Sequence, residues 1–228
     1  MTRTMISCII PAHNAERFLQ EALDSVLAQT YRPIEVVVVD DGSSDGTADV
    51  ARSAGDSVVY IHQANAGASA ARIRGIEATT GDLISLLDAD DVWLPEKLER
   101  QVAEFSARPE LDALFTHVQN FWIDELREEA ERFRDHRIAK PLPGYVADTM
   151  MVRRSAFARF GPFERVHHGE VTEWILRARH AGATIDILPD VLTRRRLHQS
   201  NLSRVLQDRS RDRFLHIVKA HLDRERGA

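Results

Sequence analysis

The chain has 228 residues, 43% of them hydrophobic, and a formal net charge of −5. This length suits one globular domain with a substantial core, and the acidic balance argues against a general nucleic-acid binder. The single cysteine, Cys8, excludes a disulfide framework and is typical of a reducing compartment. The apolar stretches are too short for a signal peptide or a membrane span, so we expect a cytoplasmic protein without a transmembrane segment.

Strand and helix patterns alternate through the first half of the chain. Four consecutive valines at residues 36–39 are typical of a strand that is covered on both faces. Asn14 is the expected N-cap of the first helix. Together the alternating patterns predict a parallel, doubly wound α/β sheet. The predicted strands are 6–10, 34–39, 58–62 and 83–87, and the predicted helices between them are 14–27, 47–54 and 65–78.

The second half is less regular. A strongly charged stretch at residues 124–137 is predicted to be helical or mobile, and Ser155 is the expected cap of a short helix that ends at Phe160. The other predicted elements are helices at 96–105 and 170–181, strands at 113–122, 149–153, 185–188 and 191–197, and a charged C-terminal helix.

In open α/β sheets, ligands bind outside the carboxyl ends of the strands. The four predicted strands of the first half are followed by polar or glycine-containing segments at residues 11–14, 40–43, 62–67 and 88–91. Their shared location predicts one binding site at this edge of the sheet.

Three carboxylates, Asp88, Asp90 and Asp91, follow the strand that ends at Leu87. Such a cluster has an unfavourable electrostatic free energy unless positive charge lies beside it. The cations Mg²⁺ and Mn²⁺ prefer carboxylate oxygens together with substrate phosphates. In extended chain Asp88 and Asp90 point to the same side, and Ala89 leaves room between them. The cluster therefore predicts a divalent-metal site. The alternative is a solvated acidic turn in which Asp91 caps the next helix.

The chain carries a series of short motifs in a fixed order. They are IPAHN at 10–14, VDDGSSDGT at 39–47, NAG at 65–67 with AR at 71–72, LDADD at 87–91 with WLP at 93–95, GPF at 161–163, and RRRLH at 194–198 with NLS at 201–203. Together they resemble the family 2 glycosyltransferases of the GT-A fold over about residues 4–204. No G-x-G-x-x-G follows the first strand, which argues against a dinucleotide-dependent dehydrogenase, and the glycine-rich, Lys/Arg-bearing loop of a nucleotidyltransferase is absent.

The resemblance implies a GT-A-type α/β fold, with a Rossmann-like, mostly parallel sheet, flanking helices and a smaller mixed C-terminal part on the acceptor side. It implies one domain over residues 1–228, with a nucleotide-sugar-binding half at about 4–108, an acceptor-side half at about 109–204 and a C-terminal helix at 205–228. The implied reaction moves a sugar, with inversion, from a nucleoside-diphosphate sugar (most often a UDP-sugar) to a glycan, peptide or small molecule. The charged stretch at 124–140 would face this acceptor, or would be a solvated surface helix.

The resemblance also implies which residues bind the donor. Asp41 would accept hydrogen bonds from the base or ribose, and Arg72, or alternatively Arg74, would contact the diphosphate. Ile73 stands where the family often has asparagine. The implied nucleotide-sugar-binding residues are Pro11, Ala12, His13, Asn14, Asp40, Asp41, Gly67, Arg72, Asp88 and Ala89.

A divalent cation, Mn²⁺ or Mg²⁺, is the implied cofactor. Asp90 would be its direct ligand, Asp88 would hold the metal or the ribose, and His198 would close over metal and phosphate. Asp91 would be an outer residue or a helix cap. Because strand side chains alternate, the arginines at 194–196 cannot all face the site.

The chain departs from the family pattern at the catalytic base, where the usual Glu-Asp pair reads Glu170-Val171. Glu173 precedes Arg177 by four residues, a spacing that favours a plain ion pair on a helix. Glu170 lies at the start of the predicted helix without an evident partner in the sequence. We favour Glu170 as the base, with Glu173 as the alternative. The missing aspartate leaves open a catalytically impaired homologue that only binds nucleotide sugars.

Overall fold

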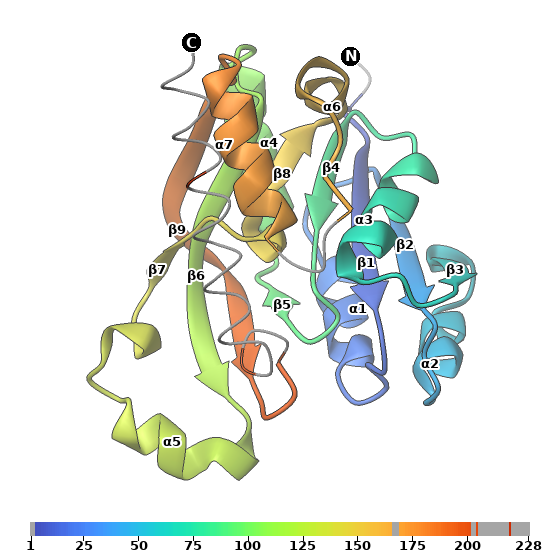
Figure 1. Cartoon of the computed structure of the whole chain (residues 1–228), viewed down its shortest axis with the longest axis vertical. Helices are drawn as coiled ribbons and strands as arrows, with labels where there is room; N and C mark the ends of the chain where they lie inside the picture. The colour runs from blue at the N-terminus through green and yellow to red at the C-terminus, as the bar shows by residue number, and fades with distance from the viewer. Residues whose placement is uncertain (1–2, 166–168, 202–203, 205–218, 220–228) are drawn as a thin grey trace.

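The computed structural model describes residues 3–165, 169–201, 204 and 219. These residues form one mixed sheet of nine strands with helices on both faces (Figure 1). The strand order is β3-β2-β1-β4-β8-β6-β9-β5, and β7 pairs with β6 beside this path. The strands are β1 (Ile6–Ala12), β2 (Ile34–Asp41), β3 (Val59–Gln63), β4 (Leu83–Leu86), β5 (Val92–Trp93), β6 (Ala113–Trp122), β7 (Leu142–Gly144), β8 (Met151–Arg153) and β9 (Ile185–Leu197).

The first four strands are mutually parallel, as the alternating pattern predicts. Their carboxyl ends therefore lie at one edge of the sheet, toward the bottom of Figure 1. The four valines of β2 are buried between helices on the two faces of the sheet. This half of the fold places the loops after β1, β2, β3 and β4 beside one another.

The second half of the sheet is antiparallel where it joins the first. The short strand β8 runs antiparallel to both β4 and β6, and β9 runs parallel to β6. The sequence predicted two strands at 185–188 and 191–197, but the structure has one strand, β9. Register shifts next to His117 of β6 take up extra residues of β9, including Pro189. A bulge of this kind lets the strand continue past a proline, which cannot donate to the ladder.

Helices cover both faces of the sheet because its strands are apolar on both sides. One core cluster joins β1 to the apolar faces of α1, α2 and α4, and another joins β4 and β6 to those of α6 and α7, while α3 packs on β1 and β2. The α-helices are α1 (Leu19–Leu27), α2 (Thr47–Ser53), α3 (Ala68–Glu77), α4 (Lys97–Ala107), α5 (Arg127–Arg132), α6 (Arg154–Phe160) and α7 (Glu170–His180). Four 3₁₀ turns complete the described elements, η1 (Gly55–Ser57), η2 (Asp124–Leu126), η3 (Arg137–Ala139) and η4 (Ala147–Thr149).

Three predicted helix caps are wrong. Helix α1 begins at Leu19 with Phe18 as its N-cap, whereas Asn14 has a left-handed backbone (φ 48°) and bonds to the loop after β2. Helix α6 begins at Arg154, so Ser155 lies inside it. Asp91 is no cap either, because Val92 and Trp93 form strand β5 before α4 starts. In each case a tertiary contact of the polar residue or its neighbours replaced the local cap.

A glycine sets how closely α3 approaches the sheet. Gly75 faces β1 and β2, and a Cβ atom added to it would collide with the side chain of Ile9 and lie 3.3 Å from Val39 Cγ2. The absent side chain lets the helix axis come close to the strands. Arg72 lies one turn earlier on the same helix.

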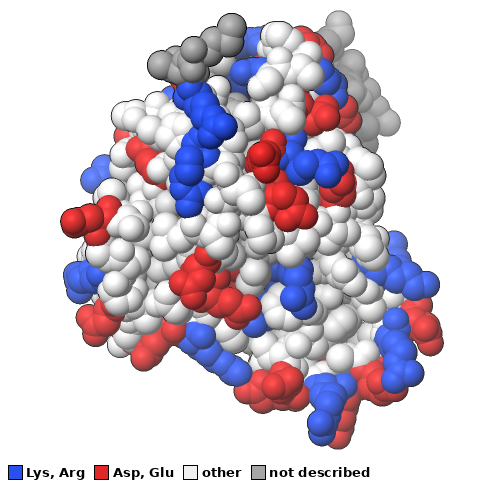
Figure 2. Space-filling view, turned by 180° about the vertical axis from the view of Figure 1, so that it is seen from behind, with Lys and Arg blue, Asp and Glu red and all other residues white. Residues whose placement is uncertain are grey.

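The charged stretch after β6 folds into η2, α5 and η3 and lies beyond the end of β6 (Figure 1). On the face of the molecule shown in Figure 2, acidic and basic side chains are interspersed, without one broad area of either sign. Among the described residues, no helix is long and apolar enough to cross a membrane. The C-terminal helix expected at 205–228 lies outside the described residues, apart from the single position 219.

Candidate active site

Asp41, the last residue of β2, holds the segment between β3 and α3. The Asp41 carboxylate accepts hydrogen bonds from the backbone N–H groups of Ala66 (2.8 Å) and Gly67 (2.7 Å) and from the Gln63 amide (2.7 Å). Gly67 has a φ of 90°, which side chains rarely tolerate, and leads into α3. Asp41 therefore fixes the segment that positions the start of α3.

Asp40 is buried beside Asp41 and has different partners. Its carboxylate accepts from the backbone N–H of Ser43 (2.9 Å) and the hydroxyl of Tyr60 (2.6 Å). Burial alone would raise the pKa of Asp40, but these hydrogen bonds lower it below its ordinary value. Burial and the hydrogen bond to Asp40 raise the pKa of Tyr60 to about 12. Asp40 is therefore a charged anchor of the turn.

The residues after β1 lie next to the loop after β2. Pro11 and Ala12 are buried, whereas His13 is exposed with its Nδ1 atom 2.9 Å from the carbonyl oxygen of Asp41. The Asn14 side chain accepts from the backbone N–H of Ser44 (2.9 Å). The predicted nucleotide-binding residues of the first two loops thus meet at one edge, as the strand order requires. Their contacts with a donor stay predictions.

Three carboxylates from two separate segments meet at the end of β4. Ligand oxygens of Asp88, Asp91 and Asp148 all lie within 4.8 Å of one another. We call these three residues the acid group. Asp148 belongs to η4, in the second half of the chain, and the sequence analysis missed it. The only signal was an aspartate inside an otherwise mostly apolar run, which is costly unless the carboxylate has a dedicated partner.

The electrostatics of the acid group indicate a place for a cation. Burial and the Asp88 carboxylate raise the pKa of Asp148 to about 7, and burial with the nearby carboxylates of Asp148 and Asp90 raises the pKa of Asp91 well above its usual range. Asp148 Oδ1 is buried and has no hydrogen-bond partner among the described residues. Oxygen-only donors and an orphaned carboxylate atom fit Mg²⁺ or Mn²⁺.

A buried polar network of Trp93, Lys97 and Gln101 holds the segment that carries Asp148. The Trp93 indole donates to the Asp148 carbonyl (2.7 Å), and the Gln101 amide donates to the Thr149 carbonyl (3.0 Å). Lys97, with no exposed surface, donates to Ser85 Oγ (3.0 Å) and to Gln101 Oε1 (2.9 Å). Burial lowers the pKa of Lys97 to about 7. Trp93 of β5 and Gln101 of α4 therefore hold the backbone carbonyls of Asp148 and Thr149 in η4, and Lys97 supports Gln101.

Arg72 of α3 lies between two carboxylates. Its guanidinium pairs with Asp88 through Nη2 and with Glu170 through Nη1. Burial alone would lower the pKa of Arg72, but the two carboxylates raise it above its ordinary value. Burial alone would raise the pKa of Asp88, but Arg72 and Asp148 lower it below its ordinary value. Arg74, the alternative diphosphate contact, is exposed on the same helix. Of the two arginines, only Arg72 contacts the predicted site.

Asp90 and His198, two predicted metal ligands, contact each other. His198 Nε2 lies 2.8 Å from Asp90 Oδ2, which also accepts from the Asn201 amide (3.1 Å). The His198 ring packs against Phe18, with the ring centroids 4.8 Å apart. The structure thus brings His198 to Asp90 in the loop that carries Asp88, but the metal ligation of both residues stays a prediction.

Arg194 and Arg196, two residues apart on β9, both lie over the ring of Phe121, but only Arg196 is buried. Arg196 is buried, donates through Nε to the Asp90 carbonyl (2.8 Å) and lies over the rings of Phe18 and Phe121. Arg194 is exposed. The backbone N–H of Arg196 also donates to Asp91 Oδ1 (2.7 Å). Strand β9 therefore holds Asp91 of the acid group through a backbone hydrogen bond.

Both candidate bases lie in the first turn of α7. Glu173 pairs with Arg177 (2.9 Å), which confirms the predicted ion pair on the helix. Glu170 is 4% exposed and pairs with Arg72, a partner that the sequence did not indicate. Residues 166–168, just before this turn, lie outside the described residues. The choice of base stays a prediction.

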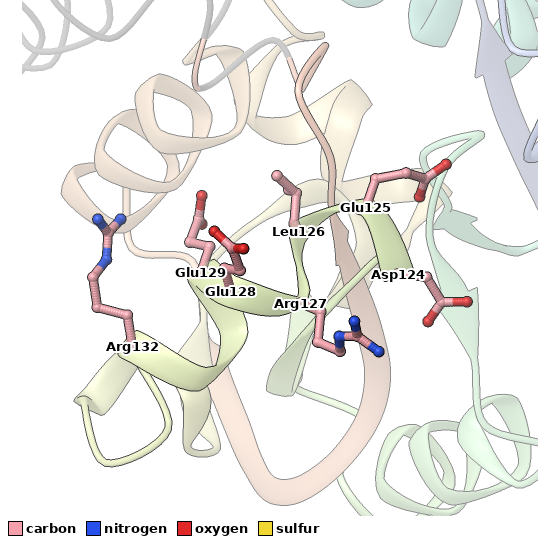
Figure 3. Close-up of a pocket in the computed structure, with 7 residues that line it drawn as sticks. All are labelled: Asp124, Glu125, Leu126, Arg127, Glu128, Glu129 and Arg132. Carbon is pink, nitrogen blue, oxygen red and sulfur yellow. The ribbon is translucent and has the colours of Figure 1, made fainter.

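A separate hollow of about 500 Å³ lies on the charged stretch. It is lined by residues 124–129 and 132 of η2 and α5 (Figure 3). Glu129 in its wall accepts from the Trp122 indole (2.9 Å) and pairs with Arg204. None of the predicted donor-binding or metal-binding residues lines this hollow.

Comparisons with known proteins agree with this arrangement. The family model for glycosyl transferase family 2 matches residues 7–161. An uncharacterized glycosyltransferase of Rickettsia prowazekii is 44% identical over 98 residues, which cover 43% of this chain and 31% of that protein. One from Nostoc sp. is 48% identical over 104 residues, covering 44% and 32%. The chain therefore spans about a third of the length of these curated relatives.

Solved structures share the fold at low identity. S. aureus TarS 1–349 in complex with UDP-GlcNAc has a TM-score of 0.70 and 18% identity, covering 86% of this chain and 59% of that one. The mannosyltransferase PcManGT from Pyrobaculum calidifontis, in complex with GDP-Man and Mn²⁺, has a TM-score of 0.67 and 19% identity, covering 88% and 59%. These matches confirm the predicted GT-A-type fold.

Proposed function

Because the chain belongs to glycosyl transferase family 2, we propose that it transfers a sugar from a nucleoside-diphosphate sugar to an acceptor, with inversion and with the help of Mn²⁺ or Mg²⁺. The observation that carries this proposal is the acid group, with Asp91 and Asp148 buried and Asp88 half-buried, at the carboxyl edge of the parallel strands. In this proposal residues 4–108 bind the donor, with a UDP-sugar the first choice, and residues 109–204 face the acceptor. TarS and PcManGT, which share the fold, were solved with nucleotide sugars.

The acid group would hold the cation. Asp88, Asp91 and Asp148 supply oxygen ligands, and a divalent cation there would offset the charge that develops on the departing diphosphate. We retain Asp90 and His198 as proposed further ligands, because the two side chains contact each other and the Asp90 side chain is 29% exposed.

The remaining donor contacts come from the loops at the same edge. Asp41 Oδ2 accepts one hydrogen bond, from Gly67, and has a second acceptor position, so Asp41 would still accept from the ribose or base while it holds the loop. Arg72 would contact the diphosphate through its guanidinium. The other proposed donor-binding residues are Pro11, Ala12, His13, Asn14, Asp40, Gly67, Asp88 and Ala89.

Glu170 would be the general base that accepts the proton of the acceptor hydroxyl. It is the candidate that reaches the acid group through a shared arginine, whereas Glu173 is held by Arg177 on its own helix. We expect Glu170→Gln to lower kcat about 100-fold or more, because a general base contributes about 10²–10⁴ to the rate. Nucleotide binding should persist, and Glu173→Gln is the matched control. Full activity in Glu170→Gln together with loss of activity in Glu173→Gln would move the assignment to Glu173.

A second candidate function follows from the ion pairs of both glutamates. With Glu170 and Glu173 each held by an arginine, the protein would bind nucleotide sugars without transferring them. Thermal-shift screening of nucleoside diphosphates and their sugars, with and without Mn²⁺, identifies the donor, because a ligand that binds the folded state raises its stability. Turnover with that donor then decides. Donor binding without transfer or hydrolysis supports the binding protein and overturns the enzyme.

A further inference from the structure

Arg72 already occupies the position of a counter-ion. Its side chain is 8% exposed, and its guanidinium pairs with Asp88 of the acid group and with Glu170 of α7. The third guanidinium nitrogen, Nε, is buried and has no hydrogen-bond partner among the described residues. One guanidinium charge is therefore shared between two carboxylates, and its Nε–H is left for a further acceptor.

Resting on the proposed function, we propose that Arg72 competes with the divalent cation for Asp88, so that the donor-free protein binds the cation weakly. The guanidinium is the ion-pair partner of this carboxylate. A cation that takes Asp88 as a ligand has to displace the guanidinium or sit beside it, and two positive charges in a buried site repel each other. Either event opposes binding of the free metal.

A diphosphate removes this opposition. It brings acceptor oxygens and negative charge, which gives the guanidinium, including its unused Nε donor, a new set of partners. Asp88 is then free for the cation. Because the same guanidinium holds Glu170, that carboxylate is released in the same event. The proposed base thus becomes available only when the donor is bound. Before donor binding, Glu170 does not accept a proton from water.

The test measures Mn²⁺ binding to the full chain without any nucleotide, by calorimetry or by water-proton relaxation. The informative variant is Arg72→Met/Glu170→Gln, which removes one positive and one negative charge and so keeps the net charge of the site. We expect it to bind Mn²⁺ at least about tenfold more tightly than the unaltered protein, because Asp88 has lost its competitor. Replacing a buried ion pair by neutral residues of similar volume is often tolerated.

The matched control is a second arginine–carboxylate pair. Asp112, just before β6 at the opposite edge of the sheet, is buried and pairs with Arg159 (2.8 Å). The double substitution Arg159→Met/Asp112→Asn makes the same kind of charge-neutral change and should leave Mn²⁺ affinity unchanged. If Arg72→Met/Glu170→Gln does not fold, Arg72→Gln/Glu170→Gln fills the space with amides that can hydrogen-bond, and the same gain is expected.

The outcomes separate this inference from the proposed function. Unaltered protein and double variant that bind Mn²⁺ equally would overturn the competition and leave metal dependence intact. No Mn²⁺ binding in any of the proteins would overturn both the competition and the proposed metal site. Tighter binding in the double variant alone supports the competition.

Discussion

The two halves of the chain contribute to the site in different ways. Residues 4–108 supply loops whose aspartates lie next to each other in the sequence and are held by nearby backbone N–H groups, as Asp40 and Asp41 are. Residues 109–204 supply single side chains from separate elements, namely Asp148 from η4, Glu170 from α7 and His198 after β9. Parallel strands bring the first set together automatically, whereas the second set depends on packing across the whole sheet.

Asp148→Asn tests this comparison most directly and should have the largest effect. It removes the only acid-group carboxylate that comes from the second half and retains the size of the side chain. We expect activity to fall about 100-fold or more and the Mn²⁺-induced rise in Tm to shrink, because a proposed ligand is lost. Activity assays and thermal shift with Mn²⁺ measure both. The control is Asp186→Asn, which alters a surface ion pair with Arg108. If Asp148→Asn retains full activity and metal response, the second half supplies no essential ligand.

Lys97→Met sharpens the comparison, since Lys97 lies in the network that holds η4. Burial lowers the pKa of Lys97 from 10.5 to about 7, so the unfolded chain binds more protons between these values and stability rises with pH. From pH 7 to pH 9 this residue should add about 2 kcal/mol to the free energy of unfolding. Above about pH 9, Cys8, with its pKa raised to about 12, acts in the opposite direction.

Denaturant unfolding at several pH values checks this expectation. Lys97→Met should be more stable than the unaltered protein at pH 7 and should lack the rise toward pH 9. A rise of the same size in both proteins would show that Lys97 is not its source.

Two substitutions of Asn14 give the smallest expected effect and probe the first half. Asn14→Gly keeps the left-handed backbone and loses the side-chain bond to Ser44, at a cost of about 1 kcal/mol of stability. Asn14→Ala also places a Cβ at a positive φ, so its cost should be larger by about 1 kcal/mol. Chemical unfolding of both variants measures the difference. Equal stabilities would mean that the backbone at this position adjusts freely.

The sequence predicted the first half well for a physical reason. Its strands are short apolar runs bounded by polar turns, and parallel pairing leaves one choice for where the turns meet. The predicted strand at 58–62 and the observed Val59–Gln63 differ by one residue at each end. Local caps were the exception, because Asn14 formed a contact with a loop about thirty residues away instead of capping α1.

The second half resisted prediction because its contacts are non-local. No spacing in the sequence connects Asp148 to Asp88, since the two meet only through the antiparallel strand β8. The Arg72–Glu170 pair joins residues 98 positions apart, so Glu170 looked unpartnered. The Glu173–Arg177 pair was predictable because both residues share one helix face.

The position of Arg72 depends on the absence of a side chain at Gly75. Since a side chain there would strike Ile9, any larger residue would push α3 outward from the sheet. Arg72 would travel with the helix, away from Asp88. The distance between Arg72 and Asp88 therefore depends on the absence of a side chain at Gly75, three residues further along α3.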